Sequence, residues 1–326
     1  MTPATRHPWL IVLNQAPVVL FLAVLALFGA RSAQFLQPDN LVNILIQSSS
    51  TAMVAIGMTF VLLTAGVDLS VGSMMFVGAA LAGKLALQGY PLLLSILAMI
   101  LAGLLGGALN ALFVTRLRIA PFIVTLATLY LGRGLGLWIT QTRAMNLPES
   151  FLHLGAGRWL GIPIPLVILG TVLLIAHIVL QHTPFGRQIY ATGQDIETAR
   201  KAGLRTGRIL ASVYIVSGAC AALGGLISLT QLGAVSPTFG AQKEFAAIAA
   251  AVLGGTSLFG GRGRVFPGTL LGAVLIQTVE NGLVILNADP YLYPLVTSAI
   301  IFVAVSLDCL RQRLVERLSR RLIRPV

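Results

Sequence analysis

Charged residues are scarce in this chain of 326 residues. Asp, Glu, Lys and Arg together make up 10% of it, whereas soluble domains carry about 25%. Hydrophobic residues make up 56% and the mean hydropathy is +0.90, which excludes an ordinary soluble fold. The net charge of +12 would indicate a nucleic-acid partner for a soluble protein. In so apolar a chain the basic residues are instead expected to set membrane topology, and no nucleic-acid partner is predicted.

Groups that catalyse reactions or hold metals are also few. The two cysteines, Cys220 and Cys309, lie in or at the edge of apolar segments and show neither metal-ligand spacing nor a disulfide framework. The four histidines are scattered, and no catalytic triad or pair of carboxylates stands out. The glycine-rich stretch from Gly254 to Arg264 lacks the Gly-Lys-Ser/Thr ending of a phosphate-binding loop. We therefore predict no catalytic residue, no cofactor and no metal site.

Long apolar runs dominate the chain instead. A helix that spans a bilayer needs about 20 apolar residues, and runs of this kind predict an all-α, polytopic transmembrane bundle. About ten helices are expected, over residues 10–30, 41–64, 70–88, 92–115, 121–140, 163–181, 209–230, 244–258, 267–288 and 291–308. The eighth is short for a full span, and in an eight-helix alternative both the third and the eighth are re-entrant. The first run exceeds the roughly 7–15 apolar residues of a signal peptide, so we expect it to be retained as an anchor.

The basic residues predict the orientation of this bundle. With a cytoplasmic N-terminus and ten alternating spans, sixteen of the 22 basic residues lie in the cytoplasm, six of them in the tail 309–326, and four lie outside. Because cytoplasmic loops are enriched in Lys and Arg, both termini are predicted to be cytoplasmic. Residues 1–326 are predicted to form a single transmembrane domain.

Two segments indicate an internal repeat. Met58 to Gly72 and Val252 to Gly268 each place an apolar helix, a glycine-rich break and a new helix at similar points of the two halves. Transporters are often built from such repeats, with the substrate site near the interface between them.

Polar side chains inside apolar runs are the candidates for a solute path. Asp68 and Ser70 lie in the break before the third helix, where they either cap that helix or mark a broken helix whose positive end faces a polar solute. Arg133 lies about twelve residues into the fifth predicted helix, and arginine at such depth is usually paired or faces water. Glu280 and Asn281 in the ninth helix offer it one partner. For Arg133, structural pairing and a lining role both stay open.

A polar, basic island occupies residues 182–208 between two long apolar runs. Asp195 is placed to cap a short helix, Glu197 suits its first turn and pairs with Lys201, and Gly203 suits its end. Because so short a helix does not persist alone, we expect it to pack on lipid headgroups or, as we favour, on a soluble cytoplasmic subunit. The predicted docking residues are Arg187, Asp195, Ile196, Glu197, Ala199, Arg200 and Gly203.

Four sequence blocks resemble those of one family. Gly57-Met-Thr59 followed by Gly66-Val-Asp-Leu-Ser-Val-Gly72 looks like the Gly-Met-Thr and Gly-Ile-Asp-Leu-Ser-Val-Gly signature of bacterial ABC importer permeases for ribose, xylose, arabinose and related solutes. The other blocks are Phe122–Leu126 with Leu131–Gly134, Phe185–Gly193, and Glu244–Ala250 with Leu253–Ser257 and Gly260–Gly263. They follow in the family's order over about residues 40 to 310. Gln194-Asp195 and Thr198 depart from the residues usual in the family, which leaves the matching ATPase open.

This resemblance implies a role and partners. It implies a permease subunit of the bacterial inner membrane that pairs with a second copy or a paralogue. Two cytoplasmic ATPase domains and a periplasmic solute-binding protein are implied as further partners, besides membrane lipid. The resemblance also places the ATPase-coupling helix in the loop 182–208. The expected function is import of a sugar or sugar-like solute, and the chain itself is expected to hydrolyse nothing.

Three alternatives stay open at this point. An ion-coupled secondary transporter would use Asp68, Arg133 and Glu280 for its coupling ion. A permease for branched-chain amino acids matches the block Gly66–Gly72 less well, and a permease for a furanosyl autoinducer shares the same blocks. The solute and the choice between homodimer and heterodimer are not predicted.

Overall fold

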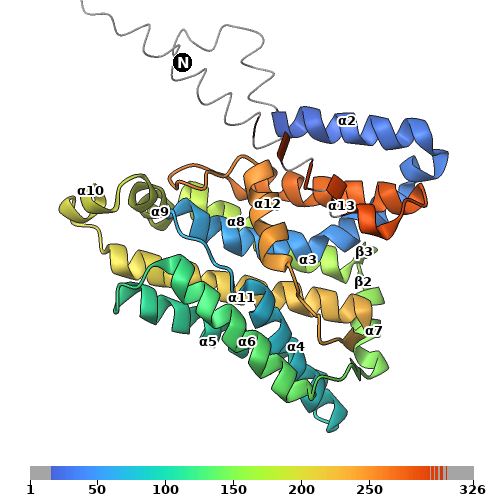
Figure 1. Cartoon of the computed structure of the whole chain (residues 1–326), viewed down its shortest axis with the longest axis horizontal. Helices are drawn as coiled ribbons and strands as arrows, with labels where there is room; N and C mark the ends of the chain where they lie inside the picture. The colour runs from blue at the N-terminus through green and yellow to red at the C-terminus, as the bar shows by residue number, and fades with distance from the viewer. Residues whose placement is uncertain (1–15, 294, 297, 300–301, 304–305, 307–326) are drawn as a thin grey trace, which may run out of the picture. The chain divides into compact units, whose positions relative to one another are not determined.

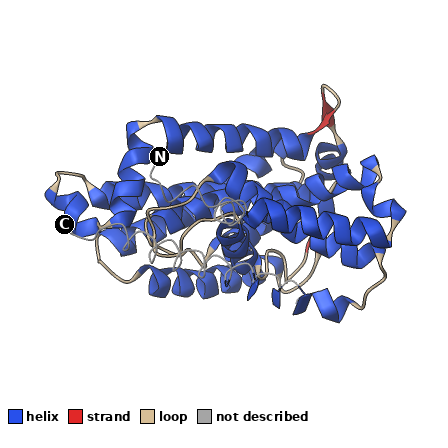
Figure 2. Cartoon of the chain, turned by 90° about the horizontal axis from the view of Figure 1, so that it is seen from above, coloured by secondary structure: helices blue, strands red, loops and turns tan. Residues whose placement is uncertain are grey.

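The computed structural model describes residues 16–293, 295–296, 298–299, 302–303 and 306. Helices make up nearly all of this part of the chain (Figure 2), which contains twelve α-helices. The predicted all-α fold is therefore confirmed. The basic tail 309–326, both termini and much of the tenth predicted helix lie outside the described residues.

The long helices follow the predicted apolar runs. They are α2 (Ala16–Arg31), α3 (Pro38–Leu63), α4 (Val71–Leu87), α5 (Leu92–Thr115), α6 (Pro121–Thr140), α8 (Ile164–His182), α11 (Thr206–Leu232) and α13 (Leu270–Ile285). Among the described residues, six helices are long and apolar enough to cross a membrane: α3, α5, α6, α8, α11 and the stretch Val265–Ile285 that includes α13. The chain is thus a polytopic helical bundle, as predicted.

Short elements connect these spans. They are α7 (Glu149–Ala156), α9 (Pro184–Gln194), α10 (Ile196–Lys201), α12 (Lys243–Leu253), the turns η2 (Ala33–Leu36), η3 (Val265–Thr269) and η4 (Pro290–Leu292), and the strands β1 (Met145–Asn146), β2 (Arg158–Trp159), β3 (Ile162–Pro163) and β4 (Ala234–Val235). The eleven residues of α12 reach about 16 Å at 1.5 Å per residue, whereas the hydrocarbon core is about 30 Å thick. The eighth predicted helix is therefore too short to span.

The described residues fall into two compact units. Those of Met1–Ile44 and Val274–Val326 form the smaller unit. In it Asn40 and Asn281 exchange side-chain hydrogen bonds of 3.0 and 3.1 Å, which satisfies two amides in apolar surroundings. The larger unit, Leu45–Ala273, holds the features described next.

Helix α11 forms the core of the larger unit, where it packs against α5 and α4, while α4 also packs against α6 (Figure 1). Glycines make this contact close. A Cβ on Gly103 of α5 would lie 2.3 Å from the carbonyl oxygen of Gly218 in α11, and a Cβ on Gly218 would lie 2.1 Å from that of Gly103. Small residues of this kind let membrane helices approach at backbone distance, so the α5–α11 seam admits no larger side chain at these positions.

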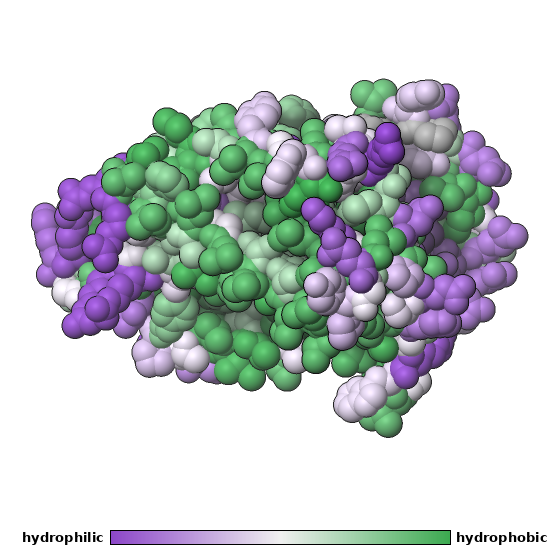
Figure 3. All heavy atoms as spheres, turned by 90° about the horizontal axis from the view of Figure 1, so that it is seen from below, coloured by the Kyte–Doolittle hydropathy of each residue, from purple (hydrophilic) through white to green (hydrophobic). Residues whose placement is uncertain are grey.

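The helix ends of the larger unit gather in two groups. At one end the amide of Gly261 donates to the carbonyl of Leu63 (2.9 Å), which joins the two breaks of the predicted repeat. At the other, β1 pairs with β4 and β2 with β3. Figure 3 shows hydrophobic side chains over much of one face and hydrophilic side chains gathered at the end where α9 and α10 lie. The Gly261–Leu63 contact and the β1–β4 pairing each bring together segments of the larger unit that are distant in the sequence.

Candidate functional site

A fully buried carboxylate, Asp68, lies in the break between α3 and α4. One of its oxygens accepts hydrogen bonds from the amide (3.0 Å) and the hydroxyl of Ser70, and the other accepts from the hydroxyl of Ser217 in α11 (2.7 Å). The Ser70 hydroxyl accepts from the side chain of Asn110 in α5 (2.8 Å), whose carbonyl accepts from the hydroxyl of Thr128 in α6 (2.8 Å). We call these five residues the polar hub. It ties the break to three neighbouring helices.

The structure does not show the helix cap that the sequence offered as one reading of Asp68 and Ser70. Ser70 occupies the N-cap position of α4, but its side chain makes no capping hydrogen bond and instead donates to Asp68. A buried carboxylate needs several hydrogen-bond donors to offset its lost hydration. The side chains of Ser70, of Asn110 in α5 and of Ser217 in α11 donate to Asp68. The polar residues of the break are therefore organised by tertiary contacts.

Three members of the hub were not identified from the sequence. Asn110 could have been identified from the sequence, because a side-chain amide inside an apolar span needs a hydrogen-bond partner. Thr128 and Ser217 gave none, since hydroxyl side chains are common in membrane helices, where they bond the preceding turn of their own helix.

Arg133 of α6 is held by several groups in the larger unit. Its Nη1 donates to the carbonyl of Phe239 (2.6 Å), and its guanidinium lies 5.7 Å from the centre of the Phe76 ring. The charge of Glu244, at the start of α12, attracts it. Both charged side chains meet at Gly72, where a Cβ would lie 2.4 Å from the Glu244 carboxylate and 3.2 Å from the guanidinium. Arg133 thus donates to a backbone carbonyl and lies over an aromatic ring, with the charge of Glu244 nearby.

The predicted path residues therefore fall in three places. Asp68 and Ser70 belong to the polar hub, and Arg133 lies beside Glu244. Glu280 and Asn281 belong to α13 in the smaller unit, where Asn281 pairs with Asn40.

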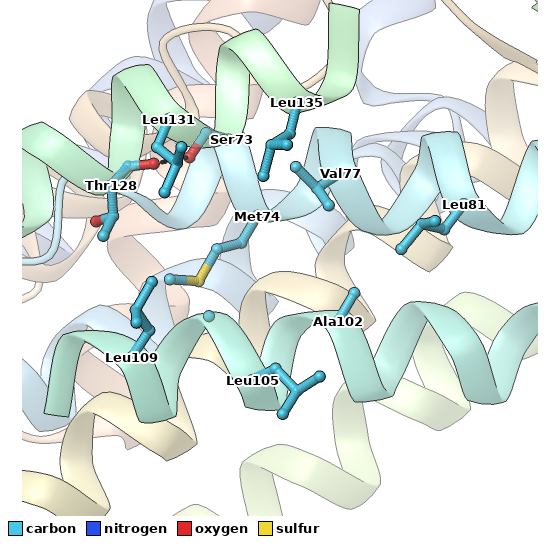
Figure 4. A pocket seen from close by; sticks show the side chains of 12 residues that line it. Ser73, Met74, Val77, Leu81, Ala102, Leu105, Leu109, Thr128, Leu131 and Leu135 are labelled. Carbon is cyan, nitrogen blue, oxygen red and sulfur yellow. Dashed lines mark hydrogen bonds between the residues drawn. The ribbon is translucent and has the colours of Figure 1, made fainter. Parts of the chain in front are cut away.

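A mostly apolar cavity of about 480 Å³ adjoins the hub between α4, α5 and α6. Figure 4 shows Met74 extending from α4 toward α5, and Ser73 of α4 next to Thr128 of α6. The two hydroxyls are already engaged, since Ser73 donates to the carbonyl of Ser70 (2.8 Å) and Thr128 donates to Asn110. A polyhydroxylated ligand would find few free partners here, so we do not assign this cavity to a sugar.

The predicted docking island forms two short helices, α9 and α10, at one end of the larger unit (Figure 1). As predicted, Asp195 caps α10, because its carboxylate accepts from the amides of Glu197 (2.9 Å) and Thr198 (3.0 Å). The hydrogen bonds from Thr198 are the main cause of a lowered pKa for Asp195. Gly203 follows the helix with a φ of +85°, a conformation that glycine adopts without strain.

One detail of this island differs from the prediction. Glu197 forms its ion pair with Arg200, three residues on, whereas the charge of Lys201 acts on Asp195 and contributes to its lowered pKa. Of the two apolar docking residues on α10, Ala199 is buried and Ile196 is 41% exposed. An exposed apolar side chain therefore stands among charged ones on α10.

Helix α9 is fixed to the larger unit at its C-terminal end. A Cβ on Gly193 would lie 1.7 Å from the carbonyl oxygen of Leu63, the last residue of α3. The Tyr190 hydroxyl donates to the carbonyl of Gly263 (2.8 Å). We call α9 and α10 together the platform. It abuts both the break that carries the hub and the turn before η3.

These features define a multi-pass membrane protein with a structured polar platform at one end of its bundle. The sequence profile of the family described as branched-chain amino acid transport system / permease component matches residues 40–305. The chain therefore belongs to this family of ABC importer permease subunits. No solved structure matches it.

Relatives cover nearly the whole chain. The ribose import permease protein RbsC of Haemophilus influenzae is 38% identical over 301 residues, which is 91% of this chain and 93% of that protein. The D-allose transport system permease protein AlsC of Escherichia coli is 37% identical over 288 residues, 87% and 88% of the two chains. The autoinducer 2 import system permease protein LsrC of Photorhabdus luminescens is 34% identical over 318 residues, 96% of each.

The predicted family and permease role are confirmed by these matches. A permease subunit of this kind is a component of a transporter and not an enzyme, and it implies an ATPase and a solute-binding protein as partners. The family assignment replaces the alternative of an ion-coupled secondary transporter.

Proposed function

We propose that this chain is the permease through which a sugar or sugar-like solute enters the cell. The names of its relatives carry this proposal, since they specify ribose, D-allose and autoinducer 2. The family description mentions branched-chain amino acids, which makes these the second candidate. Uptake of labelled ribose, D-allose and leucine by cells that express the chain with its ATPase and binding protein tests the choice. Sugar uptake without leucine uptake is expected, and the reverse would favour the second candidate.

The platform is proposed as the surface on which the cytoplasmic ATPase subunit docks, with residues 182–208 as the coupling loop. Ile196, Arg187, Glu197 and Arg200 are exposed on it, and its far end is fixed against the break after Leu63. A push on α10 would thereby reach the polar hub through packed backbone.

Co-purification of the ATPase with the tagged chain tests this docking role. Ile196→Asp is expected to lower the amount of ATPase retained and the activity of the eluate, because it places a charge in an apolar contact. Ile162→Asp is the matched control, since Ile162 is 50% exposed on β3 at the opposite end. If Ile196→Asp retains as much ATPase as the wild type, the platform is not the docking surface. An equal loss of ATPase in both variants would indicate that the substitutions disturb the fold.

We further propose that the solute path runs between two copies of the permease, or between this chain and a paralogue. Asp68, Ser70 and Arg133 are proposed to lie beside the path and position its helices, with Glu280 and Asn281 as further residues on α13. Cysteines placed at the partly exposed positions of Arg133 and Glu280 in the assembled transporter should become protected from small thiol reagents when solute and binding protein are added. Unchanged labelling would place them elsewhere.

The proposed setting is the inner membrane, with both termini and the platform in the cytoplasm. In a variant without native cysteines, Ala156→Cys at the end of α7 should be labelled from outside intact cells. Lys201→Cys on the platform should be labelled only after permeabilisation. Both positions are exposed, so the opposite pattern would invert the topology.

A further inference from the structure

A recess of about 520 Å³ lies between α9 and the beginning of α11. Its lining includes residues of α9 but none of the polar hub and none of the exposed residues Arg187, Ile196, Glu197 and Arg200 of the platform. Its lining residues are Phe185, Gln188, Gly203, Leu204, Arg205, Arg208, Ile209 and Ser212.

From the length of α11, we expect the recess to lie at the level of the membrane surface. The 27 residues of α11 extend over about 40 Å at 1.5 Å per residue, which matches the roughly 40–45 Å of a bilayer with its headgroups. The first turns of α11 are therefore expected among the headgroups. Helix α9 begins at Pro184, two residues after the spanning helix α8 ends at His182, which puts Phe185 at a similar depth.

The walls of the recess combine two basic groups with apolar surface. Arg205 and Arg208 are exposed, and among the described residues neither forms an ion pair or a side-chain hydrogen bond. Arg208 shares a face of α11 with Ser212, four residues on. Leu204 and Phe185 supply apolar contact beside the charges. Guanidinium groups bind phosphate oxygens in pairs of parallel hydrogen bonds, and the apolar wall suits an attached hydrocarbon.

We propose that this recess binds the phosphate headgroup of an anionic phospholipid. Arg205 and Arg208 contact the phosphate, and Leu204 and Phe185 contact the glycerol and the first methylene groups. A free phosphate ion would make the same charge contacts but would leave the apolar wall without a partner, so the lipid is the better fit. The recess shares the loop 182–208 with the proposed docking surface, but the lipid is assigned from the expected depth of α11 in the membrane and is tested without the ATPase.

Lipid binding to the full chain in non-ionic detergent tests the proposal. Delipidated protein is titrated with phosphatidylglycerol or with zwitterionic phosphatidylcholine, and bound lipid is counted by native mass spectrometry. The unfolding temperature is followed in parallel. Phosphatidylglycerol is expected to bind and to raise the unfolding temperature. In R205Q/R208Q its affinity should fall about thirtyfold, because each arginine is expected to strengthen binding to an anionic headgroup about fivefold. R205K/R208K keeps the charges but not the paired donors, so it should bind more tightly than R205Q/R208Q and less tightly than the wild type.

The matched control is R116Q/R118Q, because Arg116 and Arg118 are exposed at the end of α5 and do not line the recess. This variant should bind phosphatidylglycerol like the wild type. An unchanged unfolding temperature of R205Q/R208Q in phosphatidylcholine shows that it is folded. Equal binding of the two lipids by the wild type, or equal phosphatidylglycerol binding by the wild type and R205Q/R208Q, would overturn the proposal. Equal stabilisation by inorganic phosphate would identify a free anion as the ligand and also overturn it.

Discussion

Gly193 of α9 touches the main-chain carbonyl of Leu63 at the end of α3 so closely that no side chain fits between them. A Cβ at position 193 would lie 1.7 Å from the Leu63 oxygen and 2.8 Å from the amide nitrogen of Gly261. Both neighbours are backbone atoms, so no side-chain rotation can make room. The contact joins the platform to the helix break by packing alone.

Gly193→Ala is therefore expected to push α9 away from α3. Overpacking a close contact costs about 1–3 kcal/mol, so the unfolding temperature should fall, and solute uptake should fall with it. Gly170→Ala in α8 is the matched control, since nothing lies within 4 Å of the added Cβ. Unfolding in detergent and uptake in cells are measured for both. A Gly193→Ala variant as stable and active as Gly170→Ala would contradict the proposed junction.

Replacing two buried serines by alanine should have different effects on stability, because only Ser217 belongs to the polar hub. Ser217→Ala removes a hydrogen bond to Asp68 (2.7 Å) and should lower the free energy of unfolding by about 1–3 kcal/mol. Ser95 of α5 is equally buried, but its hydroxyl has no hydrogen-bond partner among the described residues. Ser95→Ala should therefore be neutral or stabilising. Denaturant titrations in one detergent compare them, and equal losses would show that the hub does not contribute to stability.

Arg133 and Glu244 are expected to be energetically coupled. Arg133→Met removes the donor to the carbonyl of Phe239 and the positive charge near the Glu244 carboxylate, which should lower stability by about 1–3 kcal/mol. Adding Glu244→Gln to this variant should recover part of the loss, because it removes the uncompensated charge. A double-mutant cycle measures the coupling. Strictly additive effects would mean that the two side chains do not interact.

The cap of α10 should depend on pH in a defined direction. Hydrogen bonds from Thr198 lower the pKa of Asp195 in the folded chain. The contribution of the cap is therefore complete above the unfolded pKa, about 3.9, and is lost as the pH falls through the lower folded pKa. Amide protection of residues 196–201, measured by hydrogen exchange and corrected for intrinsic rates, should stay constant from pH 7 to about pH 5.

Two variants isolate Asp195 in this experiment. Asp195→Asn should keep much of the protection and show no loss in acid, because asparagine caps helices without titrating. Asp195→Ala should lower the protection at every pH. A loss of protection in the wild type between pH 7 and 5 would show that a titrating group other than Asp195 determines the stability of α10.

The spans and the cap of α10 were predictable because their causes are local. Long apolar runs between glycine and proline breaks form spanning helices in a membrane. Helices α5 and α6 accordingly begin and end where the runs do. Asp195 bonds amides only two and three residues away. The predicted helix 244–258 overran, because Gly255, with a φ of +88°, already belongs to the following turn.

The contacts of the hub were not predictable in the same way. Asp68 stood out as a carboxylate among apolar residues, but its partner Ser217 is 149 residues away, and one sequence does not reveal which distant hydroxyl meets it. The proximity of Glu244 to Arg133 was missed for the same reason. Glu244 lies at the start of α12, and its distance from Arg133 depends on how α12 packs against Gly72. Because Gly72 has no side chain, both charged side chains can approach it.

The Leu63 carbonyl has a mechanical consequence for transport. Because it accepts from Gly261 and packs against Gly193, the end of α3, the platform and the turn before η3 are fastened at one point. They are expected to move as a single lever when the platform is pushed, without bending at that point. The pivot is then expected where the chain leaves the lever, at Gly203, whose backbone adopts a glycine-favouring φ and where an added Cβ would meet nothing within 4 Å.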